Sequence, residues 1–424
     1  MNIEDAGKRI EGAGGRLYFV GGGVRDQLMG KDFKDRDYAV TGLSAEEFKR
    51  LFPDAFLAGQ AFPVFRMPIA GEVAEFALAR TEKKVSTGHQ GFEVDSSPSV
   101  SIEDDLMRRD LTINAIAMDV LSNEIVDPFG GRRDIDDGII RAVSRAFAED
   151  PLRVYRAARF AAQFGFRIER QTIGFMRALH DELRTLSVER VFEELRKALQ
   201  TERPSLFFRA LLQASVLDVH FPEVAKLVGV EQPVKWHPEG DAFEHTMQVL
   251  DVAAMLTDRD EVRFSALVHD LGKGITPRHK WPAHHGHEAA GVPLTARLCA
   301  RLKLPSDWTN AALFATEHHM KIHILDRMKP QNVVTLLTEA NRNPLGVDGF
   351  AMVGLADTRG RNDPTAPSPN AESMPHMWEL IKNVTGRSIQ TDATGKEFGD
   401  ALRRERGRVI AEWRKQGNPS GTKK

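Results

Sequence analysis

The pattern of apolar and polar positions changes near residue 150, from short segments to long ones with helical periodicity. In the first part, Arg16–Val20 and Glu72–Leu78 have the length and apolar content of strands, and glycine turns separate such segments. Beyond residue 150, apolar positions recur every three or four residues over Leu152–Phe164 and Val188–Leu199, which predicts amphipathic helices. We therefore expect a mixed α+β part followed by a helical part.

Three further segments complete this outline. Residues 62–68 have a strand-like pattern and precede the turn at Ala70-Gly71. Residues 81–104 are polar and contain glycine and serine, which predicts a loop. Residues 111–119 are apolar and are expected to pack on the sheet. The tail after Gly395 is rich in arginine, which is typical of a solvated charged helix or of an RNA contact.

Composition narrows the class of protein. The chain has 424 residues, of which 42% are hydrophobic and 28% charged, as in a soluble protein of several domains. No apolar run has the length of a membrane span, so we expect a cytoplasmic protein that does not contact a membrane. The single cysteine, Cys299, excludes an intramolecular disulfide and a cysteine-based zinc cluster. Because the net charge is −2, binding to a nucleic acid would depend on local patches.

A glycine-rich turn and a pair of aspartates follow the first predicted strand. Glycines 21–23 allow tight turns and close approach to a ligand, and a helix is predicted over residues 24–29. The N-terminus of such a helix presents free N–H groups that suit a phosphate. Asp35 and Asp37 would share one face of a strand, and paired carboxylates suit Mg²⁺. Each pattern alone is common in turns or on surfaces, but together they predict a nucleotidyltransferase site.

A carboxylate and several arginines mark the start of the first long helix. Asp150 suits the N-cap position, and Arg153, Arg156 and Arg159 lie on one side of the predicted helix. A carboxylate can accept from the exocyclic amine of cytosine or adenine while a guanidinium donates to the ring nitrogen. Guanine and uracil would leave that guanidinium facing a donor. The segment predicts selection of C and A, and a solvated basic face is the alternative. Further candidates for triphosphate or ribose contacts are Arg108 and Arg109.

Histidines cluster in the helical part of the chain. Ten of the 14 histidines lie between His237 and His323. The adjacent pair His269-Asp270 ends an apolar run, and His245 lies upstream in the helical stretch 243–256. A single histidine on a helix usually serves packing, but imidazoles and carboxylates on facing helices form an open divalent-metal site. Such a site can activate water for hydrolysis of a phosphate ester.

Four motifs resemble those of a known family and occur in the same order. They are Gly-Gly-x-Val-Arg-Asp, Lys-Asp-Arg-Asp, Arg-Arg-Asp-Leu-Thr-Ile-Asn-Ala and Glu-Asp-Pro-Leu-Arg-Val-x-Arg. The chain is similar in these motifs to class II tRNA nucleotidyltransferases, the CCA-adding enzymes of the polymerase-β-like superfamily. Segments 236–239, 269–274 and 284–287 resemble the multifunctional bacterial branch, whose C-terminal HD domain is a phosphohydrolase. Gly23 departs mildly from the family pattern, which more often has alanine there.

The resemblance implies a role for each matching residue. Contacts to the incoming ATP or CTP are implied for Gly22, Arg25, Arg108 or Arg109, Asp150, Arg153 and Arg156, with Arg108 preferred over Arg109. Catalytic Mg²⁺ is implied at Asp35 and Asp37. A divalent metal, Mg²⁺, Ni²⁺ or another, is implied at His245, His269, Asp270 and Asp357. The third catalytic carboxylate is left open between Glu75 and Asp110.

The resemblance also implies the domain order. The expected fold is α+β: a polymerase-β-like head of mixed sheet and helices, an all-α neck and body, and an all-α HD domain. The expected segments are the head over residues 1–140, the neck and body with base recognition and RNA binding over 141–230, the HD domain over 231–360 and a helical tail over 361–424.

The implied reaction is template-independent addition of C, C and A to the 3′ end of tRNA from CTP and ATP, with release of pyrophosphate. The HD site would hydrolyse phosphate esters, as a 2′,3′-cyclic phosphodiesterase, 2′-nucleotidase and phosphatase. The implied partner is the acceptor arm of tRNA, bound by a monomer or homodimer. Two alternatives are a poly(A) polymerase, which would use ATP alone, and an HD phosphohydrolase whose head only senses nucleotides.

Overall fold

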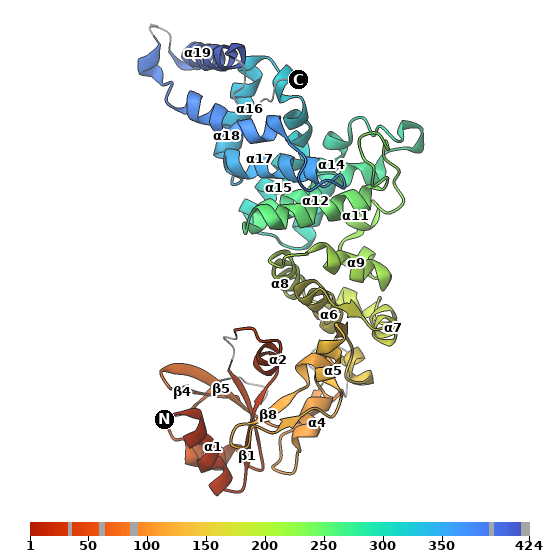
Figure 1. Ribbon diagram of the computed structural model, residues 1–424, viewed down its shortest axis with the longest axis vertical. Coiled ribbons are helices and arrows are strands. Elements are labelled where there is room, and N and C mark those ends of the chain that lie inside the picture. The colour runs from red at the N-terminus through yellow and green to blue at the C-terminus, as the bar shows by residue number, and fades with distance from the viewer. Residues whose placement is uncertain (33–35, 59–63, 85–91, 390–393, 417–424) are drawn as a thin grey trace. The chain divides into compact units, whose positions relative to one another are not determined.

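A seven-stranded mixed sheet organises the first part of the chain. The computed structural model describes residues 1–32, 36–58, 64–84, 92–389 and 394–416, in two units, Met1–Leu186 and Ser187–Lys424 (Figure 1). The sheet has the order β3-β4-β5-β2-β1-β8-β9, with β2 and β5 parallel and the other pairs antiparallel. Its strands are β1 (Arg16–Val20), β2 (Asp37–Thr41), β3 (Phe56–Ala58), β4 (Val64–Ile69), β5 (Glu72–Leu78), β8 (Ala117–Asp119) and β9 (Ile125–Val126).

Helices α1 (Ile3–Gly12), α2 (Gly22–Leu28) and α3 (Ala45–Leu51) belong to the same unit as this sheet. Ile10 of α1 and Phe48 of α3 are fully buried in one apolar core with Phe76 of β5. Phe48 contacts Phe76 with ring centroids 5.8 Å apart, so α3 is anchored on the sheet by aromatic packing. The expected strands at Arg16–Val20 and Glu72–Leu78 are confirmed, and residues 62 and 63 of the expected strand over 62–68 lie outside the described residues.

The expected loop over residues 81–104 is wrong in most of its described part. Strands β6 (Thr81–Lys84) and β7 (Phe92–Asp95) pair antiparallel, with Thr81 opposite Asp95. Helix α4 (Ile102–Met107) then begins, and the Ser101 hydroxyl and the Asp104 carboxylate form a reciprocal cap. The Ser-x-x-Asp cap is a local signal of a helix start, but serine and aspartate are also common in loops, so the polar composition predicted a loop instead. The strands are specified by pairing with each other, which local composition does not record.

The remaining elements of the first unit are short, apart from the long helix α6. η1 (Thr112–Asn114) precedes β8. After β9 come α5 (Gly131–Asp136), β10 (Ile139–Ile140), η2 (Arg145–Glu149), α6 (Leu152–Phe164), β11 (Arg167–Ile168), α7 (Arg170–Ala178) and η3 (Glu182–Thr185). The predicted helix at Leu152–Phe164 is confirmed as α6. The apolar segment 111–119 is buried over residues 111–117 and contributes β8 to the sheet, as expected.

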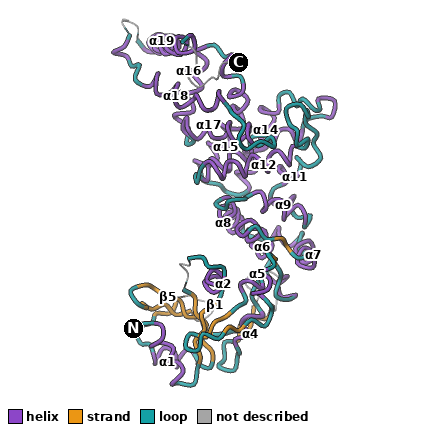
Figure 2. The backbone as a smooth tube through the Cα atoms, viewed as in Figure 1, coloured by secondary structure: helices purple, strands orange, loops and turns teal. Residues whose placement is uncertain are grey.

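Helices make up the second unit (Figure 2). They are α8 (Val188–Leu199), α9 (Ser205–Gln213), α10 (Leu217–His220), α11 (Pro222–Ala225), α12 (Ala242–Leu256), α13 (Asp260–Val268), η4 (Leu271–Ile275), η5 (Arg278–Lys280), α14 (His287–Arg301), α15 (Ser306–His323), η6 (Leu325–Arg327), α16 (Pro330–Arg342), α17 (Gly346–Arg359), α18 (Pro369–Lys382), η7 (Gly386–Ser388) and α19 (Gly395–Lys415). The α+β class expected from the sequence is therefore confirmed. In the described part of the chain, no helix has the length and apolar content needed to cross a membrane.

The arginine-rich tail forms helix α19, which packs on α16 and α18. Several of its arginines are used inside the unit: Arg408 pairs with Glu405 and Glu412, and Arg414 donates to the carbonyl oxygens of Leu325 and Met328. These contacts favour the interpretation of the tail as a charged helix anchored on the unit.

Candidate active sites

The glycine-rich turn lies between β1 and α2, as the sequence predicts. Gly21 has a φ of +75°, a backbone conformation that favours glycine. A Cβ at Gly21 would lie 3.0 Å from Nη1 of Arg109, and a Cβ at Gly22 would lie 3.4 Å from Nη2 of Arg25. The turn is thus in contact with two arginines that were expected to bind the nucleotide.

Asp37 is exposed at the start of β2, and Asp35 lies outside the described residues. Asp37 is the register partner of Glu75 on the parallel neighbour β5, so both side chains project from the same face of the sheet. The carboxylate of Glu75 accepts a hydrogen bond from Nε of Arg66 at 2.8 Å. Of the two carboxylates that the sequence left open, Glu75 is the one on the strand beside Asp37.

Asp110, the other candidate for the third catalytic carboxylate, is buried and contacts an arginine and an asparagine. Its carboxylate accepts from Nε of Arg156 at 2.7 Å and from Nδ2 of Asn114 at 3.2 Å. Burial by itself raises the pKa of Asp110, but the Arg156 guanidinium and these hydrogen bonds outweigh it and hold the pKa below its ordinary value. Asp110 therefore fixes Arg156, which the sequence placed in the nucleotide site.

Arg108 and Arg109 share a single buried carboxylate. Nη2 of Arg108 lies 2.7 Å from Oδ1 of Asp105, and Nη2 of Arg109 lies 3.1 Å from Oδ2. Burial raises the pKa of Asp105, but the guanidinium groups of Arg109 and Arg108 outweigh this effect and hold it below the ordinary value. Asp105 orients both arginines, so the structure does not separate the two alternatives.

Helix α6 carries the predicted base-reading residues. Arg153 donates to the carbonyl oxygens of Ala146 at 2.7 Å and Arg108 at 2.8 Å. The carboxylate of Asp150 accepts from the N–H of Leu152 at 3.0 Å, but the N-cap position of α6 is occupied by Pro151, so the N-cap predicted at Asp150 is wrong by one residue. The predicted pair thus lies at the start of α6 and is held by backbone contacts.

Arg25 links the glycine turn to α6. Its side chain is buried, and Nη1 donates to Oδ1 of Asn114 at 2.5 Å. Its guanidinium also lies 4.7 Å from the ring centroid of Phe164 and 5.3 Å from that of Phe160, both on α6. Because Asn114 also contacts Asp110, one network joins the turn, the η1 segment and α6.

We predict that Asp110→Asn destabilises the first unit by about 2 kcal/mol at neutral pH, because Arg156 loses a charged partner. The folded-state pKa of Asp110 is lowered, so its stabilisation is complete above the ordinary aspartate pKa of 3.8 and is lost as the pH falls through the folded-state pKa. Urea unfolding of wild type and variant at pH 7 and pH 3 measures this difference. Asp136→Asn, at an exposed position of α5, is the control. A difference that grew towards low pH would contradict the prediction.

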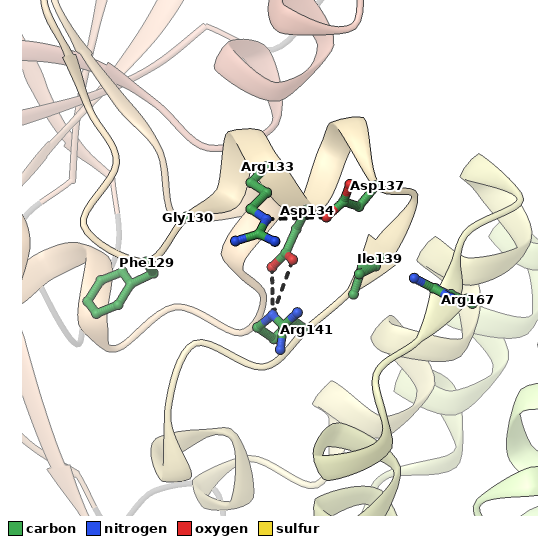
Figure 3. Close-up of a pocket in the computed structure, with 8 residues that line it drawn as sticks. All are labelled: Phe129, Gly130, Arg133, Asp134, Asp137, Ile139, Arg141 and Arg167. Atoms are coloured by element: carbon green, nitrogen blue, oxygen red, sulfur yellow. Dashed lines mark hydrogen bonds and ion pairs between the residues drawn. The ribbon is translucent and has the colours of Figure 1, made fainter.

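A separate cavity of about 560 Å³ lies in the first unit near α5 (Figure 3). Its charged groups pair with one another: Nε of Arg141 lies 2.9 Å from Asp134, and Nε of Arg133 lies 3.4 Å from Asp137. It is lined by Phe129, Gly130, Arg133, Asp134, Asp137, Ile139, Arg141 and Arg167, and none of the predicted site residues is among them.

In the second unit, the four predicted metal ligands come together. His245 lies on α12, His269 and Asp270 follow α13, Asp357 lies on α17, and all four are buried. Nε2 of His245 lies 3.1 Å from Oδ1 of Asp357 and 3.7 Å from Oδ2 of Asp270. One ligand atom from each of His245, His269 and Asp357 lies within 4.8 Å of the others. Helix packing thus brings together residues more than 100 positions apart.

Family models match segments of the chain that carry part of each site. The model of the poly A polymerase head domain matches residues 17–141, and that of the HD domain matches residues 242–342. A third model, described as the probable RNA and SrmB-binding site of polymerase A, matches residues 165–227. The chain combines a poly A polymerase head domain with an HD domain.

Solved structures of CCA-adding enzymes share the fold. A structure of the Bacillus stearothermophilus CCA-adding enzyme in complex with CTP is 23% identical, with a TM-score of 0.64 over 96% of this chain and 92% of that one. An apo form of a CCA-adding enzyme is 21% identical, with a TM-score of 0.65 over 97% and 94% of the two chains. A CCA-adding enzyme in complex with ATP is 21% identical, with a TM-score of 0.63 over 98% and 93%. The expected resemblance is confirmed in fold and in domain content.

Two histidines of the HD domain extend the cluster beyond the predicted ligands. Nε2 of His287, on α14, lies 3.1 Å from Oδ1 of Asp270, and Nε2 of His319, on α15, lies 3.4 Å from the same atom. These three side chains form a second group able to hold a metal, and Asp270 lies between the two groups. The clustering of histidines was visible in the sequence, but only the facing of α14 and α15 selects these two.

The donor set fits divalent metal ions. Among the described residues, the buried atoms Oδ1 of Asp270 and Nε2 of His269 have no hydrogen-bond partner, so both are available to a metal. Burial raises the pKa of Asp270, but the charge of Lys273 and the contact with His269 outweigh it and hold the pKa well below its ordinary value. Burial lowers the pKa of His319, which favours the neutral imidazole that metals bind. Mixed imidazole and carboxylate ligands suit a transition metal or Mg²⁺, and the geometry does not select one.

Cationic side chains surround the cluster. Lys273 is buried with Nζ 2.6 Å from Oδ2 of Asp270. On the other side, Nη2 of Arg361 lies 3.0 Å from Oδ1 of Asp357, and Nε2 of His323 lies 2.5 Å from Oδ2. Lys273 and Arg361 provide positive charge where a phosphoryl group would approach the metal ligands.

Glu239 lies behind His245. Its Oε1 is 2.8 Å from Nδ1 of His245 and 2.9 Å from Nδ1 of His237, and its side chain is 1% exposed. Burial alone would raise the pKa of Glu239, but the contacts to His237 and His245 lower it to about 2. A carboxylate at the second nitrogen of a metal-binding histidine fixes the tautomer of the ring. One ligand atom from each of His237, Glu239 and His245 also lies within 4.8 Å of the others, so these residues form a further group able to hold a metal.

We predict that Glu239→Gln weakens divalent-metal binding to the HD domain by about 10–100-fold, because His245 loses its orienting carboxylate. Competition with a chromophoric chelator measures the affinity. Glu244→Gln is the matched control, since Glu244 lies next to His245 in the chain but pairs with Arg209. Equal metal affinity of the two variants would show that Glu239 does not orient the ligand.

Proposed function

We propose that the head domain adds C, C and A to the 3′ end of tRNA from CTP and ATP, without a nucleic-acid template, and releases pyrophosphate. The observation that carries the proposal is the network from the glycine turn through Arg25, Asn114 and Asp110 to Arg156 on α6. This network supports the proposal because it connects the glycine turn to α6, the helix predicted to read the base. Two of the similar solved structures, by their descriptions, contain CTP and ATP.

In this proposal, Asp35 and Asp37 hold Mg²⁺, with Glu75 as the third carboxylate on the neighbouring strand. Bound Mg²⁺ would supply activation of the terminal 3′-hydroxyl of the tRNA and charge neutralisation of the triphosphate. Arg108, Arg109 and Arg156 face the triphosphate or ribose, held by Asp105 and Asp110. The residues that hold the nucleotide are therefore oriented before it binds, which reduces the entropy cost of binding.

Base selection is assigned to Asp150 and Arg153. Arg153 uses two of its five N–H donors on backbone carbonyls, so the guanidinium is fixed in position while other donors remain for a ring nitrogen. Asp150 would accept from the exocyclic amine of cytosine or adenine. We also propose the acceptor arm of tRNA as the partner, a monomer or homodimer as the assembly, a cytoplasmic location and the four segments 1–140, 141–230, 231–360 and 361–424 as the domains.

The test uses full-length protein, Mg²⁺ and tRNA lacking its CCA end, with labelled CTP and ATP offered singly and together. Three added nucleotides on a sizing gel are the expected result. Addition of CC alone, or of A only to tRNA ending in CC, would indicate a partial activity. A long ladder from ATP alone would indicate a poly(A) polymerase. No incorporation under any condition would leave a nucleotide-sensing head and contradict the proposal.

For the HD domain we propose hydrolysis of phosphate esters, as a 2′,3′-cyclic phosphodiesterase, 2′-nucleotidase and phosphatase. The observation that favours it is Asp270, whose two carboxylate oxygens face two groups of metal-binding side chains. Bound metal would activate water and polarise a phosphoryl oxygen. Release of phosphate or opening of a 2′,3′-cyclic nucleotide, measured with each of several divalent metals, tests it, and absence of hydrolysis with all of them contradicts it.

A further inference from the structure

Two loops lie beside the metal cluster of the HD domain and contact each other. One precedes α12 and carries Glu239, and the other contains η4 and η5 and carries Lys273. Nζ of Lys273 donates to Oε1 of Gln232 at 2.5 Å, and Nε2 of His284 lies 2.8 Å from the carbonyl oxygen of Glu231. The outer surface of the two loops therefore borders the metal cluster. We call its basic and aromatic residues the rim: Lys235, Trp236, Arg278 and Lys280, which are exposed, and Trp281, which is half-buried.

The rim is basic although the chain as a whole is slightly acidic. Residues 271–287 contain no aspartate or glutamate, and neither do residues 232–238. Lys235, Arg278 and Lys280 are exposed, and the described residues place no carboxylate in an ion pair with them. The rim therefore presents local positive charge next to a site built for a phosphate ester.

Aromatic side chains lie among these cations. Trp236 is 60% exposed, and Nζ of Lys235 lies 4.8 Å from its ring centroid. The Arg278 guanidinium lies 5.8 Å from the ring of Trp281, whose Nε1 donates to the carbonyl oxygen of Thr276 at 2.8 Å. Because the indole of Trp236 is so exposed, it stabilises the fold little, but it offers a face for stacking. Cations interleaved with aromatic rings are the arrangement with which proteins bind single-stranded nucleic acid.

We propose that the rim binds the 3′-terminal nucleotides of single-stranded RNA, with a base stacked on Trp236 and backbone phosphates at Lys235, Arg278 and Lys280. The substrate of the HD domain is then a phosphate ester at an RNA end. An RNA strand fits better than a free nucleotide. The single phosphate of a mononucleotide would lie at the metal cluster, whereas the three cations of the rim lie outside it and need the further phosphates of a strand. This inference rests on the phosphohydrolase activity proposed above.

The test compares two substrates of the metal-loaded full-length protein: a short RNA ending in a 2′,3′-cyclic phosphate and glycerol 2-phosphate, which has no aromatic group. Trp236→Ala is expected to lower the ratio of kcat/KM for RNA to kcat/KM for glycerol 2-phosphate by about tenfold, the value of one stacked base. Trp236→Phe keeps a stacking face and should restore most of that ratio. Lys235→Ala with Arg278→Ala should raise KM for RNA and weaken its salt dependence. Met255→Ala, at a residue that is 73% exposed on α12, is the control.

Three outcomes would overturn the inference or the proposal beneath it. An unchanged ratio in Trp236→Ala would overturn binding at the rim. An equal loss for 2′,3′-cyclic AMP and for the RNA would show that a mononucleotide is the ligand. If the wild type hydrolyses nothing, the phosphohydrolase proposal fails, and RNA-dependent quenching of tryptophan fluorescence, compared between wild type and Trp236→Phe, still decides whether the rim binds RNA.

Discussion

Asp37→Ala is expected to lower nucleotide incorporation by about a thousandfold, equivalent to about 4 kcal/mol of transition-state stabilisation. The carboxylate projects from β2 beside Glu75, where the proposed Mg²⁺ would be held. Loss of this ligand would weaken binding of the Mg²⁺ that neutralises the triphosphate. Because Asp37 is exposed, the free energy of unfolding should change by less than about 0.5 kcal/mol. Initial rates of CTP incorporation and urea unfolding provide the two measurements.

The matched control is Asp54→Ala, an exposed aspartate of the same unit that precedes β3, which is separated from β2 in the sheet by β4 and β5. Glu75→Gln provides a second test of the same site, since it keeps the size of the side chain and removes its charge. A loss comparable to that of Asp37→Ala would identify Glu75 as the third carboxylate. If Asp37→Ala retained wild-type incorporation, the catalytic role proposed for the head would be wrong.

Asp270→Ala is expected to weaken metal binding to the HD domain by more than about 100-fold and to eliminate phosphoester hydrolysis. Asp270 forms one group of ligands with His287 and His319, and its Oδ2 lies 3.2 Å from Nε2 of His269 in the other group. Nucleotide incorporation by the head should persist, since its site lies in a different unit. The variant should also lose about 3–5 kcal/mol of stability, because the buried Lys273 is left without its carboxylate. Metal titration, hydrolysis and incorporation assays on one preparation separate these effects.

Asp270→Asn keeps the shape of the side chain and isolates the loss of charge from the loss of packing. Asp307→Ala, at an exposed position in the first turn of α15, is the control for the unit. Incorporation lost together with hydrolysis in Asp270→Asn would indicate that the two sites are not independent. Metal bound with unchanged affinity would exclude Asp270 as a ligand.

Local chemistry in the sequence was enough for several elements and motifs. The apolar content that predicts β1 and β5 and the periodicity that predicts α6 and α8 reflect which positions of each element are buried, so they can be read without the fold. The adjacency of His269 and Asp270 indicated a metal site for a similar reason, because neighbouring residues stay close in any fold. The resemblance to CCA-adding enzymes then gave the order of the domains.

Tertiary structure decided everything that depends on contacts between distant segments. Only the pairing of β2 with β5 places Glu75 beside Asp37, and only the network around α6 assigns Asp110 to Arg156. The strands β6 and β7 exist through their mutual pairing, which a polar composition conceals. His287 and His319 join the metal cluster because α14 and α15 pack on each other, and Glu239 joins it because the loop before α12 brings its carboxylate to His245. Such packing is fixed by the sum of many buried contacts that no single segment of the sequence contains.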